Sequence, residues 1–569
     1  MKLRTERKKK ENGFSEIIDK NKKRLLSLGI ILTMILFMLV TRLAYIQIIK
    51  KEDYYLKATN QWFKEIPVGV ARGRIYDRNM QPLTNKNILN YVVIFPDIFQ
   101  KTDSNLDIIS KLTGIDKQML RYERLRGNRP VQLQTIEMSH DLMKEAMGIR
   151  GVYPLEIEER YDEKKLASHL IGYINKIDNI GFQGLERYYN ELLIENQSFK
   201  IGAIVDAQKR IIPGLGYKYI QESTSKERKN IVTTIDINIQ KIIEEEFDSQ
   251  KRKGSIVVLN AKNGDLLGMV SRPNFNQNDV ASHLNSSEQE FFNRAIQIAY
   301  PPGSVFKIVL AAAALENNLI APEQTYFCKG YEAFEENVIK CSSYEKDGHG
   351  WLDLKSAFAV SCNSYFIQLG KEIGGKEILS MAERLGFGKK TGIELPEEIP
   401  GTLPDEDYIK GAGIGNTSIG QGVLGVTPLQ IAKMTAIIAN DGIDTGTHLT
   451  KEIVDDDGMI VEDFSSRQEI QRISKNTAKE LQKMMEKVVV EGTARSANSI
   501  DGVSFAGKTG SAEAVSDGKN TVHAWFTGYF PVVDPKYVIT IIVEDGGSGG
   551  RVAVPLFSNI AERINNLSS

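Results

Sequence analysis

The segment that decides the fold is residues 300–307, which read Tyr-Pro-Pro-Gly-Ser-Val-Phe-Lys. The prolines and the glycine are unsuited to a helix interior, whereas Ile308 to Leu315 is rich in strong helix formers. Ser304 is therefore predicted at a helix N-terminus, with Lys307 about one turn later on the same face. There the lysine amine reaches the serine hydroxyl, as a nucleophile and its base require. The alternative is a capping serine with a surface lysine.

A base of this kind must be uncharged. The Lys307 amine is neutral near pH 7 only if burial and nearby positive charge lower its pKa. A positioned base contributes roughly 10² to 10⁴ in rate. Lys508 is the predicted source of the positive charge.

A second motif is Ser361-Cys362-Asn363. Ser361 is predicted to relay a proton to a departing amine, and the Asn363 amide to hold a substrate backbone by hydrogen bonds. Both side chains also cap helices well, so a plain helix N-cap is the alternative interpretation of this segment.

A third motif, Lys-Thr-Gly, occurs twice. Residues 390–392 lie in a stretch rich in turn residues and are predicted to form a loop. Lys508, Thr509 and Gly510 precede two predicted strands and suit a sheet edge, where a substrate lies alongside as an added strand. There Lys508 and Thr509 would hold a carboxylate, and Gly510 would permit close backbone approach. The N–H groups of Ser304 and Ser511 would form an oxyanion hole, whose single donors are commonly worth ~10² to 10³ in kcat.

The surrounding sequence predicts an antiparallel sheet. Residues 236–247 show helical spacing, with Asp236 as the cap, and residues 254–260 and 266–271 form a hairpin signalled by Asn263-Gly264. Residues 523–529 and 537–543 resemble strands, and residues 555–567 resemble a closing helix. A helix and hairpin at the front, with strands and a helix at the back, indicate a sheet in which both ends of the domain meet.

The chain of 569 residues exceeds the size of one core, so we expect several domains. Residues 25–47 form a strongly apolar run and are predicted to be an uncleaved membrane anchor. Residues 1–24 hold ten Lys/Arg against four Asp/Glu, which predicts a cytoplasmic tail and an extracytoplasmic remainder. A cleaved signal peptide is the rival interpretation. Residues 48–225 are predicted to be a non-catalytic pedestal with strands near 91–95 and 201–205, and residues 226–569 the catalytic domain, divided at the polar stretch 222–230.

Composition excludes several classes of function. The net charge of -1 gives no general electrostatic basis for binding nucleic acid. The three cysteines rule out a disulfide-built scaffold and show no C-x-x-C spacing, and the six histidines are scattered, so no metal site is predicted. Cys328 and Cys341 are either a disulfide pair or two free thiols.

Taken together, these motifs show that the sequence resembles the class B penicillin-binding proteins. Ser304 to Lys307, Ser361 to Asn363 and Lys508 to Gly510 match the S-x-x-K, S-x-N and K-T-G set. Residues 72–79 are similar to the pedestal signature R-G-x-I-x-D-R-N-G of that family, although Met80 replaces its final glycine. Further matches are Gly184-Leu185-Glu186, Asn293-Arg294-Ala295, Gly420-Gln421-Gly422 and Trp525-Phe526-Thr527-Gly528.

The resemblance implies an α+β penicillin-binding/serine β-lactamase-like domain, with helices on both sides of an antiparallel sheet, on an elongated pedestal with one transmembrane helix. It implies a peptidoglycan D,D-transpeptidase that cross-links stem peptides through an acyl-enzyme on Ser304 and is acylated by β-lactam antibiotics. It also implies no metal or organic cofactor, and a SEDS-family glycan polymerase as the membrane partner.

Three other classes compete with this interpretation. A bifunctional class A protein needs the acidic motifs of a glycosyltransferase, which the pedestal lacks. A β-lactamase shares the catalytic motifs but needs neither a span nor a pedestal of this size. In a non-enzymatic alternative, the fold serves only as an antibiotic sensor or scaffold.

Overall fold

The structure is a computed structural model that describes residues 2–51, 54, 63–66, 72–96, 98–127, 130–136, 140–175, 179–194, 199–204, 217–221, 229–321, 323–334, 337–410, 412–497, 503–516 and 518–567. The chain divides into two compact units. Unit 1 comprises Met1–Val68, Asn90–Glu156 and Phe199–Gln221, and unit 2 comprises Gly69–Leu89, Ile157–Ser198 and Glu222–Ser569.

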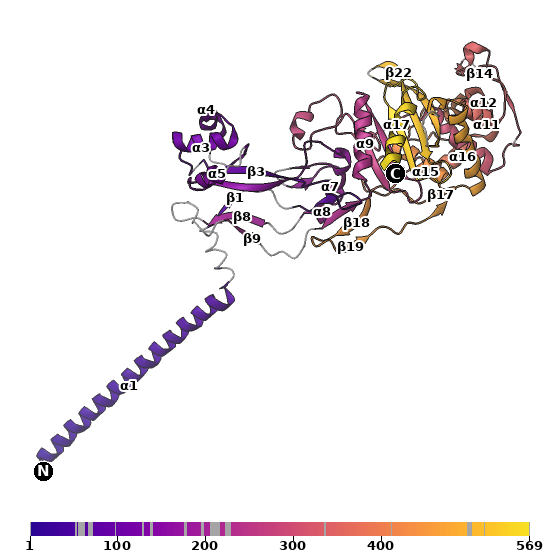
Figure 1. Cartoon of the computed structure of the whole chain (residues 1–569). Coiled ribbons are helices and arrows are strands. Elements are labelled where there is room, and N and C mark those ends of the chain that lie inside the picture. The colour runs from indigo at the N-terminus through magenta and orange to yellow at the C-terminus, as the bar shows by residue number, and fades with distance from the viewer. Residues whose placement is uncertain are drawn as a thin grey trace. The chain divides into compact units, whose positions relative to one another are not determined.

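Unit 1 begins with one long helix, α1 (Lys2–Ala44), which continues as a π-helical turn, Tyr45–Ile49 (Figure 1). Among the described residues one helical segment, Asn21–Ile49, is long and apolar enough to cross a membrane. Its large apolar side chains are exposed, with Leu32 at 67% and Phe37 at 73%. Such exposure is unfavourable in water and costs nothing in lipid. The predicted anchor, residues 25–47, lies within this segment.

Among its described residues, the rest of unit 1 holds two small sheets, in the orders β1-β8-β9 and β4-β3-β5, with short helices. Its core consists mainly of aliphatic side chains, among them Val92 and Leu106, which are fully buried. Both strands predicted here are present. The elements are β1 (Phe63–Ile66), β3 (Asn87–Ile94), α3 (Asp103–Thr113), α4 (Lys117–Met119), a π-helical turn (Leu120–Arg124), β4 (Val131–Gln134), α5 (His140–Met147), β5 (Val152–Glu159), β8 (Phe199–Ile204) and β9 (Tyr217–Gln221).

Unit 2 is built on a five-stranded antiparallel sheet in the order β12-β11-β23-β22-β21. The front hairpin therefore pairs with the last strand of the chain, which confirms the prediction that the ends of the domain meet. The strand β21 lies at the edge, also as predicted. The strands are β11 (Gly254–Asn260), β12 (Leu266–Arg272), β21 (Ala506–Ser516), β22 (Lys519–Phe530) and β23 (Tyr537–Val543).

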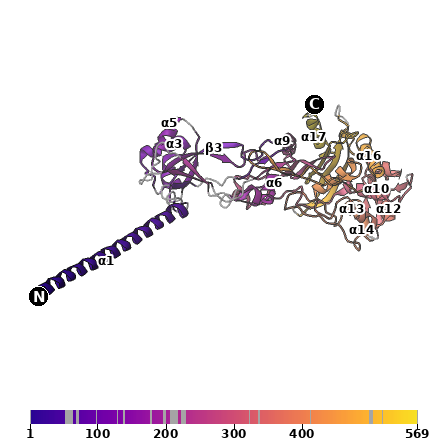
Figure 2. The same ribbon diagram turned by 90° about the horizontal axis from the view of Figure 1, so that it is seen from below.

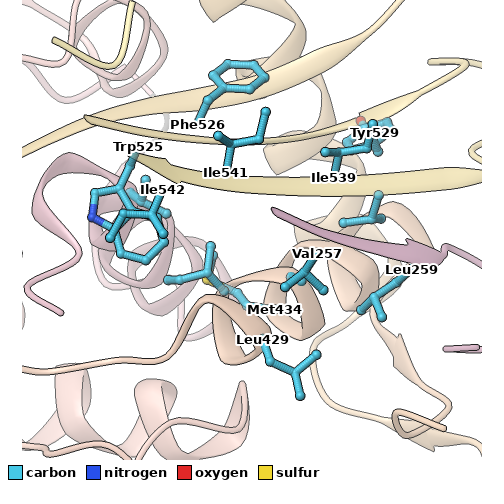
Figure 3. Packing of buried hydrophobic residues seen from close by; sticks show 14 of the residues in the cluster. Val257, Leu259, Leu429, Met434, Trp525, Phe526, Tyr529, Ile539, Ile541 and Ile542 are labelled. Carbon is cyan, nitrogen blue, oxygen red and sulfur yellow. The ribbon is translucent and has the colours of Figure 1, made fainter. Parts of the chain in front are cut away.

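Helices cover both faces of this sheet. On one face Phe526 packs against Phe557 of α17 (Ala553–Leu567), with ring centroids 4.8 Å apart. On the other face Trp525 and Ile542 point toward α15 (Pro428–Ala439), which carries Met434 (Figure 3). Alternate residues of a strand point to opposite faces, and neighbouring Trp525 and Phe526 follow that rule. The predicted α+β architecture is confirmed.

The front helix and a second helical group complete unit 2. The helix α9 (Ile237–Ser249) begins at Asp236, whose carboxylate accepts the N–H groups of Asn238 and Ile239, as predicted. The helices α10, α11, α12, α13, α14 and α16 pack on one another (Figure 2). Their bounds are α10 (Lys307–Glu316), α11 (Leu354–Ala359), α12 (Asn363–Ile373), α13 (Gly375–Arg384), α14 (Ala412–Ser418) and α16 (Lys475–Val490).

Short elements connect these parts of unit 2. They are β2 (Ile75–Tyr76), α6 (Ser168–Ile171), β6 (Ile174–Asn175), β7 (Ile180–Gly181), α7 (Gly184–Tyr188), α8 (Asn190–Leu193), β10 (Asn230–Thr233), β13 (Tyr326–Cys328), β14 (Tyr331–Phe334), β15 (Asn337–Lys340), β16 (Gly350–Leu352), β17 (Ile443–Asp444), β18 (Thr450–Val454), β19 (Ile460–Asp463), β20 (Ile470–Gln471) and the 3₁₀ turns Val280–His283, Gly303–Phe306, Tyr344–Lys346 and Arg495–Ala497.

Residues 69–89 and 157–198, which the sequence placed in the pedestal, cluster with unit 2. The strand β2 pairs in parallel with β10, and buried Arg72 donates to buried Glu186 at 2.5 Å. Arg160 donates to the same carboxylate at 2.7 Å. The compact units therefore do not follow the predicted division at 225/226. That division remains a prediction, since residues 222–228 of the polar stretch lie outside the described residues.

Met80 occupies the turn where the related signature has glycine. The turn forms, with Asp77 accepting the N–H groups of Asn79 and Gln81 at 2.8 Å each. Met80 takes a φ of +62°, a left-handed conformation that costs a residue with a Cβ roughly 1–2 kcal/mol. The substitution is therefore tolerated at the expense of backbone strain.

Met80→Gly is expected to stabilise unit 2 by roughly 0.5–1 kcal/mol, because relief of this strain outweighs the greater unfolded-state freedom of glycine. The Met80 side chain is 45% exposed, so little buried apolar contact is lost. Thermal unfolding should show a higher midpoint for this variant. Glycine at exposed Met119, which lies in a helix, is the control and should lower the midpoint. An unchanged or lower midpoint for Met80→Gly would show that the turn is not strained.

Candidate active site

Ser304 lies on the turn that leads into α10. Residues Gly303–Phe306 form a 3₁₀ turn, and the α-helix begins at Lys307. Ser304 is half-buried, while Val305 and Phe306 beside it are fully buried. The predicted helix start is confirmed, with the difference that its first turn is 3₁₀ rather than α. The Ser304 hydroxyl can therefore be reached by a ligand, while the buried side chains of Val305 and Phe306 hold the turn in place.

Three contacts from distant segments fix this turn. The Trp525 indole Nε1 donates to the Pro301 carbonyl at 3.1 Å, and the Gly303 N–H donates to the Gly420 carbonyl at 2.9 Å. The Tyr300 hydroxyl donates to Glu544 Oε1 at 2.6 Å. Trp525 and Gly420 belong to the matching segments noted in the sequence. The roles of Tyr300 and Glu544 were not predicted, because no local pattern links residues so far apart.

Lys307 is fully buried and points its ammonium at the second motif. Its Nζ donates to the Ser361 carbonyl at 2.8 Å, to Ser361 Oγ at 3.3 Å and to Asn363 Oδ1 at 2.7 Å. Among the described residues these are its hydrogen-bond partners, and the Ser304 hydroxyl is not one of them. The Asn363 Nδ2 donates to the Lys340 carbonyl at 3.0 Å.

Ser361 stands between two lysines. Its Oγ accepts from Lys307 Nζ and also from Lys508 Nζ, at 3.0 Å, across 147 residues of sequence. Ser361 has a φ of +56°, which is unfavourable for a residue with a Cβ. The segment does begin a helix, but the N-cap of α12 is Cys362 rather than Ser361 or Asn363. Because Cys362 supplies the cap, the side chain of Ser361 can contact both lysines and that of Asn363 can contact Lys307.

Burial sets the electrostatics of the two amines. It lowers the pKa of Lys307 to about 8, against the opposing influence of negative charge on Cys362 and Cys341. Burial also lowers the pKa of Lys508 well below its usual range, and repulsion from Lys307 lowers it further. The sequence predicted that positive charge on Lys508 lowers the pKa of Lys307. Burial alone does so, and the repulsion between the amines instead lowers the pKa of Lys508. Each ammonium faces an aromatic ring, Phe366 for Lys307 and Phe358 for Lys508.

The edge strand β21 brings the third motif against the Ser304 turn. A Cβ added at Gly510 would lie 2.9 Å from Val305 Cγ2 and 3.0 Å from the Pro302 carbonyl oxygen. A Cβ added at Gly303 would lie 2.8 Å from the Ser511 carbonyl oxygen. Glycine at both positions is therefore required for this packing. The Thr509 hydroxyl lies 2.6 Å from that of Thr493, a partner that was not predicted.

The other Lys-Thr-Gly segment is a loop, as predicted. Lys390 is exposed, and the Thr391 and Gly392 N–H groups donate to the Glu398 carboxylate at 2.7 and 3.1 Å. These two hydrogen bonds to Glu398 hold the loop of residues 390–392 in place.

The three cysteines are buried free thiols, so the disulfide alternative for Cys328 and Cys341 is not the one in this structure. They gather with His349 beside the second motif, and their ligand atoms lie within 4.8 Å of one another. Among the described residues this is a set of side chains capable of holding a metal ion. It went unpredicted because its members come from separate segments and leave no short spacing pattern.

Comparison with known families identifies the region that carries this site. Residues 254–562, more than half of the chain, match the penicillin-binding protein transpeptidase domain. The chain belongs to the penicillin-binding protein family. Residues 67–219 of this penicillin-binding protein also match the penicillin-binding protein dimerisation domain. That pair of domains agrees with the class B assignment.

Relatives of this penicillin-binding protein span nearly its whole length. It is 30% identical to stage V sporulation protein D of Bacillus subtilis over 95% of this chain and 85% of that protein. It is also 30% identical to peptidoglycan D,D-transpeptidase MrdA of Haemophilus influenzae, over 94% and 90%. A solved chain from a peptidoglycan synthase complex that coordinates polymerization and crosslinking superposes with a TM-score of 0.72 at 25% identity, over 95% and 98%.

Proposed function

We propose that Ser304 is the nucleophile of this peptidoglycan D,D-transpeptidase. The observation that carries the proposal is that two lysines donate to Ser361 Oγ. One is Lys307, which lies one turn after Ser304, and the other is Lys508, which is 147 residues from Ser361 in the sequence. Two buried lysines around one hydroxyl are costly to desolvate, and such arrangements concentrate where proton transfer is needed. A helix-capping serine with a surface lysine does not account for this burial.

The proposed reaction gives each of these groups a role. The Ser304 Oγ attacks the D-alanyl-D-alanine carbonyl carbon, and Lys307 accepts the hydroxyl proton. The N–H groups of Ser304 and Ser511 stabilise the oxyanion that forms. The C–N bond to the terminal D-alanine then breaks. Ser361 gives its hydroxyl proton to the departing amine and regains a proton from Lys307. An amine of a neighbouring stem peptide attacks the acyl-enzyme by the reverse route and regenerates Ser304.

Substrate binding prepares the base. Lys508 and Thr509 hold the substrate carboxylate, while Asn363 hydrogen-bonds the substrate backbone. Because the two amines repel each other, they favour a single positive charge between them. A carboxylate beside Lys508 draws that charge to Lys508 and leaves Lys307 neutral. The bound substrate thereby activates its own catalytic base, and β-lactams with a similar carboxylate acylate Ser304 by the same steps.

The membrane arrangement belongs to the same proposal. The basic tail, residues 1–24, stays in the cytoplasm, and the anchor at 25–47 places the pedestal, residues 48–225, and the transpeptidase domain, residues 226–569, outside. A SEDS-family glycan polymerase is the proposed membrane partner, contacted by the pedestal. The similarity to a chain of a peptidoglycan synthase complex that coordinates polymerization and crosslinking supports this partner.

A penicillin-trapping experiment tests the proposed function against its alternatives. The full chain in detergent, treated with fluorescent penicillin, is expected to keep a covalent label for many minutes after free penicillin is removed. The same preparation should join a stem peptide to an acceptor amine with release of D-alanine. Loss of the label within seconds would indicate a β-lactamase. Stable labelling without cross-linking or D-alanine release would indicate a sensor or scaffold.

A further inference from the structure

Two exposed aromatic rings lie side by side on a small sheet that packs on α12. Phe327 of β13 and Trp351 of β16 are directly opposite each other in the strand pair, and their ring centroids are 5.4 Å apart. Trp351 is 69% exposed and Phe327 is 47% exposed, although both residue types are usually well buried. Adjacent exposed aromatic side chains mark a contact site more often than a single scattered one does. These two residues are called the aromatic platform.

The platform differs from the two tyrosines next to it in the sequence. The Lys329 ammonium lies 4.5 Å from the Tyr331 ring centroid, and the Lys340 ammonium lies 4.2 Å from the Tyr344 ring centroid. Within the described part of the chain, no cation lies over either ring of the platform, and the indole N–H of Trp351 donates to no protein group. The platform therefore offers open ring surface and one free hydrogen-bond donor.

The helix α12 connects the platform to the second motif. The Gln368 Nε2 donates to the Phe327 carbonyl at 3.0 Å. Gln368 lies in the same helix as Asn363, roughly 7 Å further along the helix axis. Phe327 therefore lies roughly 10 to 15 Å from Asn363, the proposed ligand of the substrate backbone.

The substrate of a peptidoglycan transpeptidase carries a suitable occupant on the same molecule. A stem peptide of about five residues spans up to ~17 Å when extended, and its other end is joined to a glycan strand. A stem peptide bound at Ser304 and Asn363 therefore brings its sugars within reach of the platform. A pyranose ring packs its C–H groups on an aromatic ring, and its hydroxyl and N-acetyl oxygens accept a hydrogen bond from an indole N–H.

We propose that Phe327 and Trp351 bind the glycan strand of the substrate by stacking on its N-acetylated amino-sugar rings. The inference rests on the proposed function, because the reach is measured from a stem peptide bound at Ser304. The size of the platform favours sugars over a protein partner. A specific protein interface covers roughly 800 Å² on each partner, whereas two rings match one or two sugar rings. The platform thereby makes the enzyme prefer stem peptides that are attached to glycan over free ones.

Glycan binding by the full chain in detergent tests the platform without reference to catalysis. The probe is a peptide-free strand of alternating N-acetylglucosamine and N-acetylmuramic acid, titrated by calorimetry. Trp351→Ala and Phe327→Ala should each weaken binding roughly tenfold, and Trp351→Phe, which keeps a ring, should retain most of it. Phe292→Ala is the matched control, because Phe292 is 45% exposed and lies outside the platform. Equal affinity in wild type and all four variants, or no binding at all, would overturn the proposal.

Cross-linking separates the platform from the proposed catalytic residues. Wild type should use a glycan-linked stem peptide with a kcat/KM roughly tenfold above that of the free peptide, mainly through a lower KM. Trp351→Ala should lose this preference, and Phe292→Ala should keep it. A retained preference in Trp351→Ala would overturn the proposal, even if that variant had lost binding to a second copy of the chain or to lipid vesicles.

Fluorescent penicillin provides the check on the active site, because it carries no glycan. A wild-type chain that binds glycan but is not labelled would contradict the role of Ser304 and leave the platform intact. A labelled wild-type chain that shows no preference for glycan-linked peptide would overturn the platform and leave the role of Ser304 intact.

Discussion

Ser304→Ala is expected to abolish covalent labelling by fluorescent penicillin, with a loss of at least ~10⁴-fold in acylation rate. The hydroxyl is the atom that forms the acyl bond, and no neighbouring group replaces a missing nucleophile. Gel fluorescence of wild-type and variant protein, over a range of penicillin concentrations, measures the effect.

The variant should remain folded, because Ser304 is only half-buried and its hydroxyl makes no hydrogen bond that holds the turn among the described residues. Thermal unfolding within about 2 °C of wild type checks this. Persistent labelling of a folded Ser304→Ala variant would mean that another residue is the nucleophile.

Lys508→Ala is expected to slow penicillin acylation by roughly 10 to 10²-fold, the value of one or two charge-assisted hydrogen bonds to a carboxylate. The chain supplies its own matched control in Lys390, which has the same two residues after it. Lys390→Ala should label within about twofold of wild type, because its side chain is exposed on a loop.

Penicillin methyl ester sharpens this comparison. Without a carboxylate, the ester should react poorly with wild type and should show little further loss in Lys508→Ala. Equal effects of Lys508→Ala on acid and ester would indicate that Lys508 acts on the lysine pair rather than on the carboxylate. Strong loss in Lys390→Ala would show that the two motifs were assigned in the wrong order.

Local sequence chemistry accounts for much of the fold. The cap at Asp236, the Asn263-Gly264 hairpin and the prolines before Ser304 each act within a few residues, so the elements that they begin were predictable. The edge position of β21 was predictable as well, from the strands that follow it.

What escaped prediction depends on contacts between distant segments. The hydrogen bonds from both lysines to Ser361 and the cluster around His349 arise only when separate segments of the chain meet. A spacing rule such as C-x-x-C detects ligands that share one turn, and this cluster does not. The same reason explains why residues 69–89 and 157–198 cluster with unit 2. The parallel pairing of β2 with β10 and the hydrogen bond from Arg72 to buried Glu186 link segments that are far apart in the sequence, so no local pattern predicts them.

The most direct measurement is a crystal structure of the chain after reaction with penicillin. We predict a covalent bond from Ser304 Oγ to the opened ring, the penicillin carboxylate on Lys508 and Thr509, and Ser361 between the two lysines. An adduct on any other residue, or a carboxylate bound away from Lys508, would contradict the account.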